Sequence, residues 1–258
     1  CTLIGFGEAA STFAQAGSWG ASVAGYDLLP ARRLAITKSG LIAGDTPALA
    51  LADSPLILSL VTADQALAAA QNAAPYIMPN AIWCDMNSVA PTTKRAAADA
   101  ISAAGRRYVD VAVLAPVNPA KMAVPLLLSG DAAPDAARQL ALLGFSNIRI
   151  VGSEIGRASA IKMIRSVMVK GIEALTAEMM LAADAAGVSD EVLASLDASE
   201  QPQGWHTRAA YNRERMAKHG LRRAAEMQES AKTLIALGVE PIMTQGTILR
   251  QRALGNHI

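Results

Sequence analysis

The sequence predicts an α/β chain with a doubly wound, mostly parallel sheet over residues 1–152, followed by an all-helical domain over residues 153–258. Two observations carry this prediction. The first half alternates short apolar runs with Ala-rich amphipathic stretches, joined by short loops. After Gly152 the alternation stops, and apolar residues recur at three- and four-residue spacing instead.

The elements of the first half follow one another in a regular order. Strands are expected at 2–4, 22–26, 55–61, 81–85, 107–114, 124–128 and 147–151, and helices at 10–15, 63–74, 91–104 and 134–143. Pro91 suits the first turn of its helix, because the amide that proline lacks has no partner there.

The second half begins with a long helix, predicted over 154–186, and Gly187 is a suitable stop. Its apolar stripe consists of Ile161, Ile164, Met168, Ile172, Leu175 and Met179. Further helical segments are predicted at 189–198, 205–218 and 221–237, with Gly238 and Pro241 ending the last. The long helix has more apolar surface than a domain of this size easily covers, so a homodimer is expected.

Composition excludes several classes of protein. The net charge of +1 gives no reason to expect a nucleic-acid or membrane partner, and no apolar run reaches membrane-spanning length. The first residues are predicted to form a strand rather than a signal peptide. Cys1 and Cys84 make no disulfide framework, so a cytoplasmic location is expected. The three histidines show no metal-ligand spacing, and no metal is expected.

The first predicted strand runs directly into Gly5-Phe6-Gly7-Glu8-Ala9-Ala10, which is G-x-G-x-x-A. In a dinucleotide-binding turn, Gly5 would make the tight bend and Gly7 would let the backbone approach a pyrophosphate at the helix N-terminus. Ala10 would allow close packing of helix and strand. The alternative is a tight strand–helix turn that binds no ligand.

Asp27 follows the second predicted strand, twenty residues after Gly7. A carboxylate there would accept hydrogen bonds from the adenosine ribose and repel a 2′-phosphate, which favours NAD. Arg32 and Arg33 lie close enough along the chain to support binding of NADP as well.

Loops after the later strands hold further candidates, because α/β sheets bind ligands at the carboxyl ends of their strands. Val61 and Thr62 follow one strand, and Asn87 and Ser88 follow the next. Asn87 and Ser88 would face the nicotinamide and its ribose, cap the following helix, or both.

A turn-rich loop after the strand that contains Asp110 holds Asn118 and Lys121. Both side chains suit an anionic substrate, and both are equally compatible with a solvated loop.

Polar residues gather on one face of the long helix near its start: Ser159, Lys162, Arg165 and Ser166. On a surface helix these would be solvated charges. If this part of the helix borders the cofactor, Lys162 is a candidate proton-transfer group, since burial and a neighbouring cation both favour a neutral amine. Arg165 has the planar fork that suits a substrate carboxylate.

The chain resembles the β-hydroxyacid dehydrogenase family, relatives of 6-phosphogluconate dehydrogenase, over essentially its whole length. Residues 5–10 resemble the family fingerprint, 85–91 its D-x-S-T-x-x-P segment, and 156–165 its G-x-G-x-x-x-K-x-x-N helix motif. The resemblance assigns the catalytic role to Lys162.

Two positions and one segment depart from the family pattern. Ala158 replaces the second Gly and Arg165 the Asn of the helix motif, and 110–116 keeps little of the substrate-binding D-x-P-V-S-G-G. The departures indicate a separate branch with its own C-terminal helical domain and a different substrate.

The sequence therefore predicts an NAD(P)-dependent oxidoreductase acting on a small, anionic hydroxy acid or related alcohol, with Lys162 as general acid/base. Two alternatives are an imine reductase on the same scaffold and a nucleotide-sensing protein without turnover. Phosphoryl transfer is disfavoured because no G-x-x-x-x-G-K-[ST] occurs.

Overall fold

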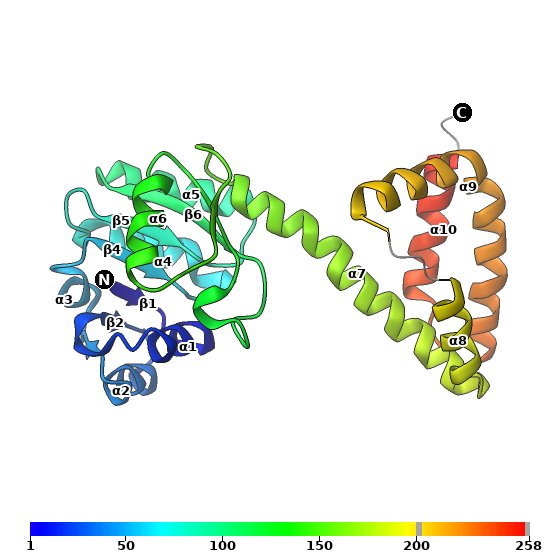
Figure 1. Ribbon diagram of the computed structural model, residues 1–258, viewed down its shortest axis with the longest axis horizontal. Coiled ribbons are helices and arrows are strands. Elements are labelled where there is room, and N and C mark those ends of the chain that lie inside the picture. The colour runs from blue at the N-terminus through cyan, green and yellow to red at the C-terminus, as the bar shows by residue number, and fades with distance from the viewer. Residues whose placement is uncertain (200–202, 256–258) are drawn as a thin grey trace. The chain divides into compact units, whose positions relative to one another are not determined.

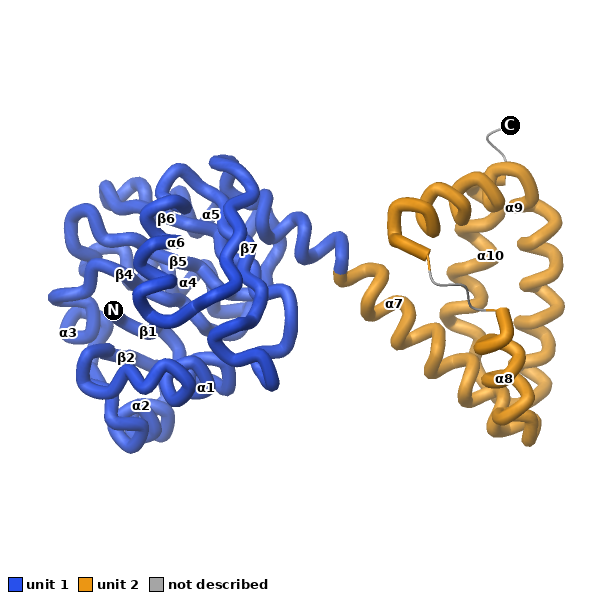
Figure 2. Tube along the Cα trace, viewed as in Figure 1, with its two compact units in different colours: residues 1–165 blue, residues 166–258 orange. Residues whose placement is uncertain are grey.

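The computed structural model describes residues 1–199 and 203–255. It divides into two compact units, residues 1–165 and residues 166–258 (Figure 2). The division falls within one long helix, and the domain boundary expected at residue 152 stays a prediction. No helix in the described ranges is both long and apolar enough to cross a membrane.

Unit 1 is built around one eight-stranded sheet (Figure 1). Its strands are β1 (Thr2–Ile4), β2 (Ala24–Tyr26), β3 (Ile42–Ala43), β4 (Leu56–Ser59), β5 (Ile82–Asp85), β6 (Arg107–Val113), β7 (Leu126–Ser129) and β8 (Ile148–Ile150). Their order is β3-β2-β1-β4-β5-β6-β7-β8, and only the β6–β7 pair is antiparallel. The chain reverses its direction of travel across the sheet between β1 and β4, which is the topological switch point.

Helices cover the sheet on both faces. They are α1 (Glu8–Ala16), α2 (Pro30–Lys38), α3 (Pro47–Leu51), α4 (Ala66–Ala73), α5 (Pro91–Ala103) and α6 (Ala133–Leu142), with short 3-10 turns η1 (Gly20–Ser22), η2 (Ala63–Gln65), η3 (Ala74–Tyr76) and η4 (Lys121–Ala123).

Alternate residues of each strand enter opposite cores. In β1, Leu3 packs in the core that contains Phe13 of α1, and Ile4 packs in the core that contains Ile101 of α5. Strands buried on both faces are continuously apolar, which is why they were recognisable in the sequence. The doubly wound, mostly parallel sheet is confirmed.

Two details of unit 1 differ from the expectation. The helix predicted over 63–74 is divided into η2, α4 and the start of η3, and Pro75 lies in the first turn of η3. The short elements α2, β3 and α3 were not predicted, because they lie at the edge of the sheet and carry exposed apolar residues such as Leu34, Ile42 and Leu49.

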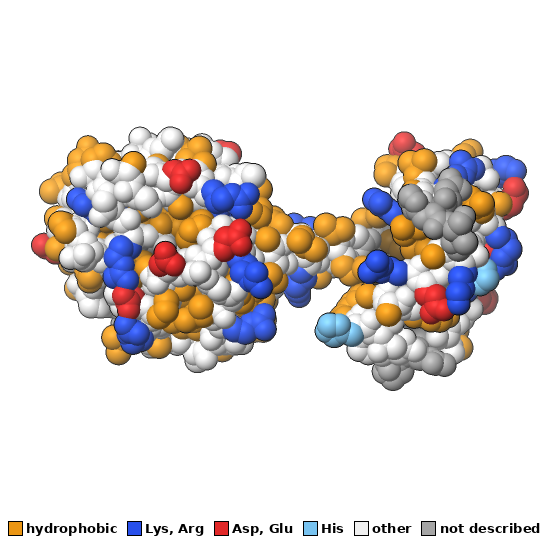
Figure 3. Space-filling view, turned by 90° about the horizontal axis from the view of Figure 1, so that it is seen from above, with side chains coloured by type: hydrophobic (Ala, Val, Ile, Leu, Met, Phe, Trp, Pro, Cys, Tyr) orange, Lys and Arg blue, Asp and Glu red, His pale blue; other side chains and the backbone are white. Residues whose placement is uncertain are grey.

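The described part of unit 2 is entirely helical. Its helices are the C-terminal part of α7 (Arg157–Ala186), α8 (Ser189–Ser199), α9 (Trp205–Ala236) and α10 (Ile242–Gly255). Figure 3 shows apolar side chains along the exposed length of α7, where Val167 is 76% and Leu175 is 46% exposed.

Helix α9 corrects the prediction of two separate segments at 205–218 and 221–237. Gly220, which lies between the two predicted segments, is inside one continuous helix. A Cβ atom at Gly220 would lie 2.3 Å from the carbonyl oxygen of Gln251 and 2.9 Å from the Cα of Gly255. The glycine is therefore needed for the close approach of α9 and α10, and it does not end a helix.

Helix α10 was not predicted. Gly238 and Pro241 follow the end of α9 at Ala236, as expected, and Pro241 also lies directly before the start of α10. Glu178 of α7 caps this start: one carboxylate oxygen accepts from the amide of Met243 at 2.6 Å, and the other accepts from the amide and the hydroxyl of Thr244 at 2.8 and 2.6 Å. Burial alone would raise the pKa of Glu178, but these hydrogen bonds, with that of the Thr244 hydroxyl first, outweigh it and lower the pKa below its ordinary value.

We expect Glu178→Gln to lower the stability of unit 2 by about 1–3 kcal/mol, because the amide loses the charge-assisted hydrogen bonds to α10. A carboxylate whose pKa is lowered by folding stabilises the protein above its unfolded pKa, and that stabilisation is lost as the pH falls through the folded value. The difference between wild type and variant in urea unfolding should therefore shrink on acidification below about pH 4. Glu173→Gln, at an exposed position of α7, is the control and should have no effect; an equal effect of both changes would contradict the cap.

Candidate functional site

A pocket of about 650 Å³ opens at the carboxyl edge of the sheet, at the switch point between β1 and β4. Gly5 and Gly7 line it after β1, Asp27 after β2, and Val61 and Thr62 after β4. Its volume lies within the range of small-molecule sites, roughly 300–1,000 Å³. Five residues predicted from separate motifs are thus brought into one pocket.

The two glycines of the fingerprint differ in their surroundings. Gly5 has φ +89°, and a Cβ there would lie 2.6 Å from the carbonyl oxygen of Leu60, so the fold itself requires glycine. A Cβ at Gly7 would meet no protein atom within 4 Å. Nothing in the protein needs Gly7, and the open space over it suits a ligand that approaches the backbone closely.

The rest of the fingerprint lies at the start of α1, whose first turn has Gly7 as N-cap and no capping side chain. The helix N-terminus therefore keeps donors for an anion. Phe6 and Ala10 are buried, Ala9 is half-buried and Glu8 is exposed.

Asp27 holds the phosphate-binding turn and the end of β2 together. Its Oδ2 accepts from the amide of Phe6 at 2.8 Å, and its Oδ1 accepts from the amide of Leu29 at 2.9 Å. A carboxylate oxygen can accept more than one hydrogen bond, so both oxygens of Asp27 keep capacity for ribose hydroxyls.

The two neighbouring arginines differ in their positions. Arg32 lines the pocket, whereas Arg33 donates to the carbonyl oxygens of Asp27 and Leu28 at 2.8 and 3.0 Å. These residues fit a dinucleotide: open backbone donors for the pyrophosphate, a carboxylate for the ribose, and apolar side chains such as Leu29 for the adenine.

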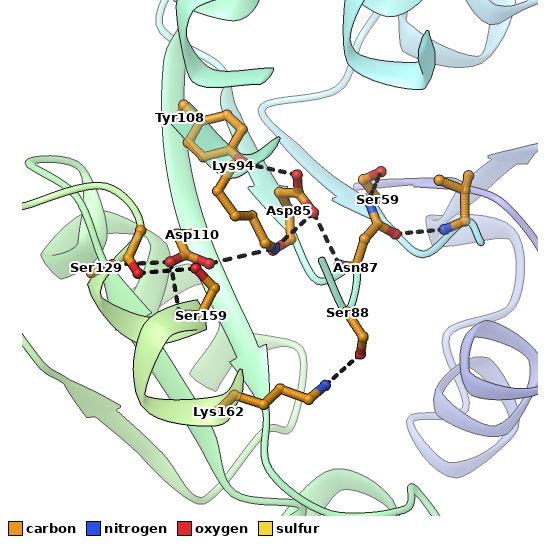
Figure 4. Close-up of polar contacts among 12 residues, drawn as sticks. Ser59, Asp85, Asn87, Ser88, Lys94, Tyr108, Asp110, Ser129, Ser159 and Lys162 are labelled. Atoms are coloured by element: carbon orange, nitrogen blue, oxygen red, sulfur yellow. Dashed lines mark hydrogen bonds and ion pairs between the residues drawn. The ribbon is translucent and has the colours of Figure 1, made fainter. Parts of the chain in front are cut away.

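Lys162 meets Ser88 at the same edge of the sheet. The Nζ of Lys162, on the second turn of α7, donates to the Oγ of Ser88 at 2.5 Å (Figure 4). Ser88 itself lies in the loop after β5 and is exposed.

Asn87 and Ser88 do not cap helix α5, so that part of the prediction is wrong. The N-cap of α5 is Ala90, with no side-chain hydrogen bond. Asn87 instead accepts from the amide of Val61 at 2.7 Å and donates to the hydroxyl of Ser59 at 3.0 Å. It therefore ties the loops after β4 and β5 to each other.

A buried ionic network lies in the interior of unit 1, next to the loop of Ser88 and the first turn of α7 (Figure 4). Lys94 of α5, only 1% exposed, lies with its Nζ 2.9 Å from the Oδ1 of Asp85 and 3.4 Å from the Oδ1 of Asp110. Its Nζ also donates to the backbone carbonyl of Asp85 at 2.6 Å. Both carboxylates are fully buried and lie on neighbouring strands.

Tyr108 completes the environment of Asp85 by donating its hydroxyl to Oδ2 at 2.7 Å. Burial, and next the charge of Asp85, raise the pKa of Tyr108 far above its ordinary value, so the phenol remains a donor. Burial, and next the same charge, raise the pKa of the Cys84 thiol to about 12, which makes Cys84 a packing residue rather than a nucleophile.

The network also fixes the start of α7. The Oδ2 of Asp110 accepts from the amide of Ser159 at 2.9 Å, and the hydroxyl oxygen of Ser129 accepts from the amide of Ala158 at 3.1 Å. A carboxylate at a helix N-terminus is favoured by the helix dipole. The backbone amide of Asn87 donates to the Oδ1 of Asp85 at 3.0 Å. The turn that precedes Lys162 and the loop of Asn87 are thus both anchored to the buried network of Asp110, Lys94 and Asp85.

The sequence reasoning missed Lys94, Tyr108 and Ser129. One signal was available: Lys94 lies three, four and seven residues before Ala97, Ala98 and Ile101, which form the apolar face of α5. A lysine on the buried face of a helix requires a carboxylate partner.

The remaining predicted residues lie in different surroundings. Ser159 is buried and its hydroxyl donates to the carbonyl of Gly156 at 3.0 Å, while Arg165 is exposed and donates to the carbonyl of Leu114 at 3.1 Å. Ser166 is half-buried on α7. Asn118 and Lys121 are exposed in the loop between β6 and β7.

Comparison with known families matches two parts of the chain. The NAD binding domain of 6-phosphogluconate dehydrogenase matches residues 2–144. A domain of unknown function, DUF1932, matches residues 183–254.

Solved structures extend the likeness to nearly the whole chain. A conserved hypothetical protein from Sinorhizobium meliloti is 37% identical with a TM-score of 0.64, covering 98% of this chain and 87% of its own. The conserved protein MTH1747, described as structurally similar to 3-hydroxyacid dehydrogenases, is 30% identical with a TM-score of 0.64, covering 98% and 95%.

A more distant relative shares the fold. An imine reductase from Myxococcus stipitatus in complex with NADP⁺ is 17% identical with a TM-score of 0.79, covering 98% of this chain and 92% of its own. A variant of that enzyme is in complex with NAD⁺.

We expect Lys94→Met to destabilise the protein by about 3–5 kcal/mol, because two buried carboxylates lose their only cation among the described residues. Lys38→Met, at an exposed position of α2, is the control and should lie within about 0.5 kcal/mol of wild type. Chemical denaturation measures both. An equally stable Lys94→Met variant would mean that Asp85 and Asp110 do not depend on the lysine charge.

Proposed function

The chain belongs to the family that shares the NAD binding domain of 6-phosphogluconate dehydrogenase, whose members are NAD(P)-dependent oxidoreductases, and we propose that it interconverts the alcohol group of a small hydroxy acid and the corresponding carbonyl group. The observation that carries the proposal is the contact of Lys162 with Ser88 at the carboxyl edge of the sheet. This contact holds an amine beside the loop that continues from Asn87.

A bound nicotinamide would supply the hydride acceptor or donor. Lys162 would take the proton of the substrate hydroxyl during oxidation and return it during reduction. Ser88 orients the amine by accepting one of its hydrogen bonds, and the buried network fixes the helix turn before it.

We assign the substrate carboxylate to Arg165, whose guanidinium is one helical turn from Lys162, with Asn118 as a further donor. Arg165 uses one N–H for the carbonyl of Leu114 and keeps others for an anion. Lys121, Ser159 and Ser166 are further proposed substrate-binding residues, on the sequence pattern alone.

Imine reduction is the second candidate, because the fold is shared with an imine reductase. In that reaction Lys162 would act as a protonated donor to the nitrogen rather than as a base. A screen of hydroxy acids, diols and cyclic imines with both nicotinamide cofactors, followed by the absorbance of the reduced cofactor, distinguishes the two. Turnover of imines alone would overturn the hydroxy-acid proposal, and cofactor binding without any turnover would favour a sensor.

We expect Lys162→Met to lower kcat by roughly 10²–10⁴-fold while the Kd of the cofactor stays near the wild-type value, because only the proton site is lost. Lys170→Met, at an exposed position two turns further along α7, should keep full activity. Steady-state rates and cofactor titration give the two readouts. A Lys162→Met enzyme that retains more than about a tenth of kcat in a chemistry-limited assay would refute the assignment.

We propose that NAD is preferred to NADP by about tenfold or more, because the Asp27 carboxylate lines the pocket and repels a 2′-phosphate. Asp27→Ala should lower the ratio of NAD affinity to NADP affinity. Arg32→Met should weaken NADP binding more than NAD binding, since Arg32 lines the same pocket. Fluorescence titration with both cofactors measures the ratios. Equal or tighter binding of NADP by the wild type would show that Arg32 outweighs Asp27.

We also propose that the protein is a homodimer that covers the apolar stripe of α7, where Ile164 and Ile172 are 72% and 45% exposed. Light scattering at micromolar protein concentration should give twice the chain mass. Ile172→Glu should shift the mass towards the monomer, because it places a charge in the stripe, while Lys170→Glu should not. A monomeric wild type would contradict the proposal.

A further inference from the structure

Helix α9 carries cations that pair with carboxylates and others that do not. Lys218 pairs with Glu214, Arg222 with Glu226, and Lys232 with Glu229, each within one helical turn. Arg215 and Arg223 form no ion pair with any residue in the described ranges.

Both arginines line a small pocket within unit 2, together with Asn212 and Met216 of α9 and Gln251 of α10. The pocket has a volume of about 240 Å³. Since a water molecule occupies about 30 Å³ in the liquid, a ligand of several heavy atoms has room there.

Two buried polar atoms in this pocket have no hydrogen-bond partner among the described residues. They are the Nε of Arg223, a donor, and the Oε1 of Gln251, an acceptor on a side chain that is only 7% exposed. Four such atoms occur in the described part of the chain, so half of them are gathered at one small pocket. Buried polar atoms are nearly always paired, and leaving one unpaired costs about 1–3 kcal/mol.

The chemistry of these groups defines a ligand. An oxyanion would accept from the Nε of Arg223 and compensate part of the positive charge of the two guanidinium groups. The Oε1 of Gln251 is different, because an acceptor requires a donor on the ligand. A ligand that pairs both atoms therefore carries an anionic oxygen and, close to it, a donor such as a hydroxyl group.

Arg215 is already oriented at the pocket. Its Nη1 donates to the hydroxyl of Tyr211 at 3.0 Å, and its guanidinium lies 5.3 Å from the centre of the Tyr211 ring. These contacts leave its other N–H groups for an anion and reduce the conformational entropy lost on binding.

We propose that this pocket of unit 2 is a binding site for a small hydroxy acid, with its carboxylate on Arg223 and Arg215 and its hydroxyl donating to Gln251. The site involves only α9 and α10. It stands independently of the turnover proposed at Lys162, and it gives the helical domain a ligand of its own.

The test is calorimetric titration of the full-length protein with glycolate, without a nicotinamide cofactor and at constant chloride concentration. Saturable binding is expected. Acetate should bind at least about tenfold more weakly than glycolate, because it lacks the hydroxyl group that donates to Gln251. Arg223→Met should weaken glycolate binding by about tenfold or more, whereas Arg222→Met, the paired neighbour, should change it less than about twofold.

Thermal unfolding measurements distinguish a loss of glycolate binding from a loss of folding. In chloride buffer the thermal midpoint of Arg223→Met should equal or exceed that of the wild type, because an unpaired buried donor is removed. Glycolate should raise the midpoint of the wild type and not that of the variant. If Arg223→Met does not fold, Arg215→Met at its exposed position and Gln251→Leu take its place, with the same expected loss of binding.

Three results would overturn the proposal. One is the absence of saturable glycolate binding, which would mean that water alone satisfies the two atoms. Another is an equal loss in Arg222→Met and Arg223→Met, which would indicate a nonspecific charge effect. The third is glycolate binding that is lost in Arg165→Met and kept in Arg223→Met. This result would mean that the calorimetric signal comes from the substrate site proposed in unit 1.

Discussion

The ion pair of Lys94 with Asp85 and Asp110 is the constraint on which the candidate site depends. Asp85 organises the loop that carries Asn87, and Asp110 accepts from the first turn of α7. Lys94 compensates both carboxylates in a fully buried environment. Without this cation, two like charges on adjacent strands would repel each other, and the parts that carry Ser88 and Lys162 would lose their common support.

The cofactor pocket rests on a different principle. Its shape follows from strand order, since the chain reverses direction between β1 and β4 and leaves a crevice at the carboxyl edge. Asp27 then joins the fingerprint turn to the end of β2 through the amide of Phe6. The proposed cofactor site and the proposed proton site thus depend on different strands of one sheet, β1, β2 and β4 for the first and β5 and β6 for the second.

Glycines and prolines show how far local sequence can be interpreted. Gly5 has the positive φ that its motif predicts, and Pro91 opens α5 as expected. Gly220 lies inside one helix where two segments were predicted, because a glycine required for helix–helix contact has the same local signature as a glycine that ends a helix. Which of the two applies depends on α10, a partner that local sequence does not identify.

The sequence by itself determined the strands of the sheet other than β3, the fingerprint turn, the long helix and the residues that follow these strands, because periodicity and spacing are local properties of the chain. Only the tertiary structure decided how Lys94 is used, what Asn87 contacts and that α9 is continuous. Each of these depends on residues distant in sequence: Asp110 for Lys94, Val61 for Asn87 and Gln251 for Gly220. Polar side chains satisfy their hydrogen bonds with whichever partner folding brings near, and the pairing of distant segments cannot be derived from one segment alone.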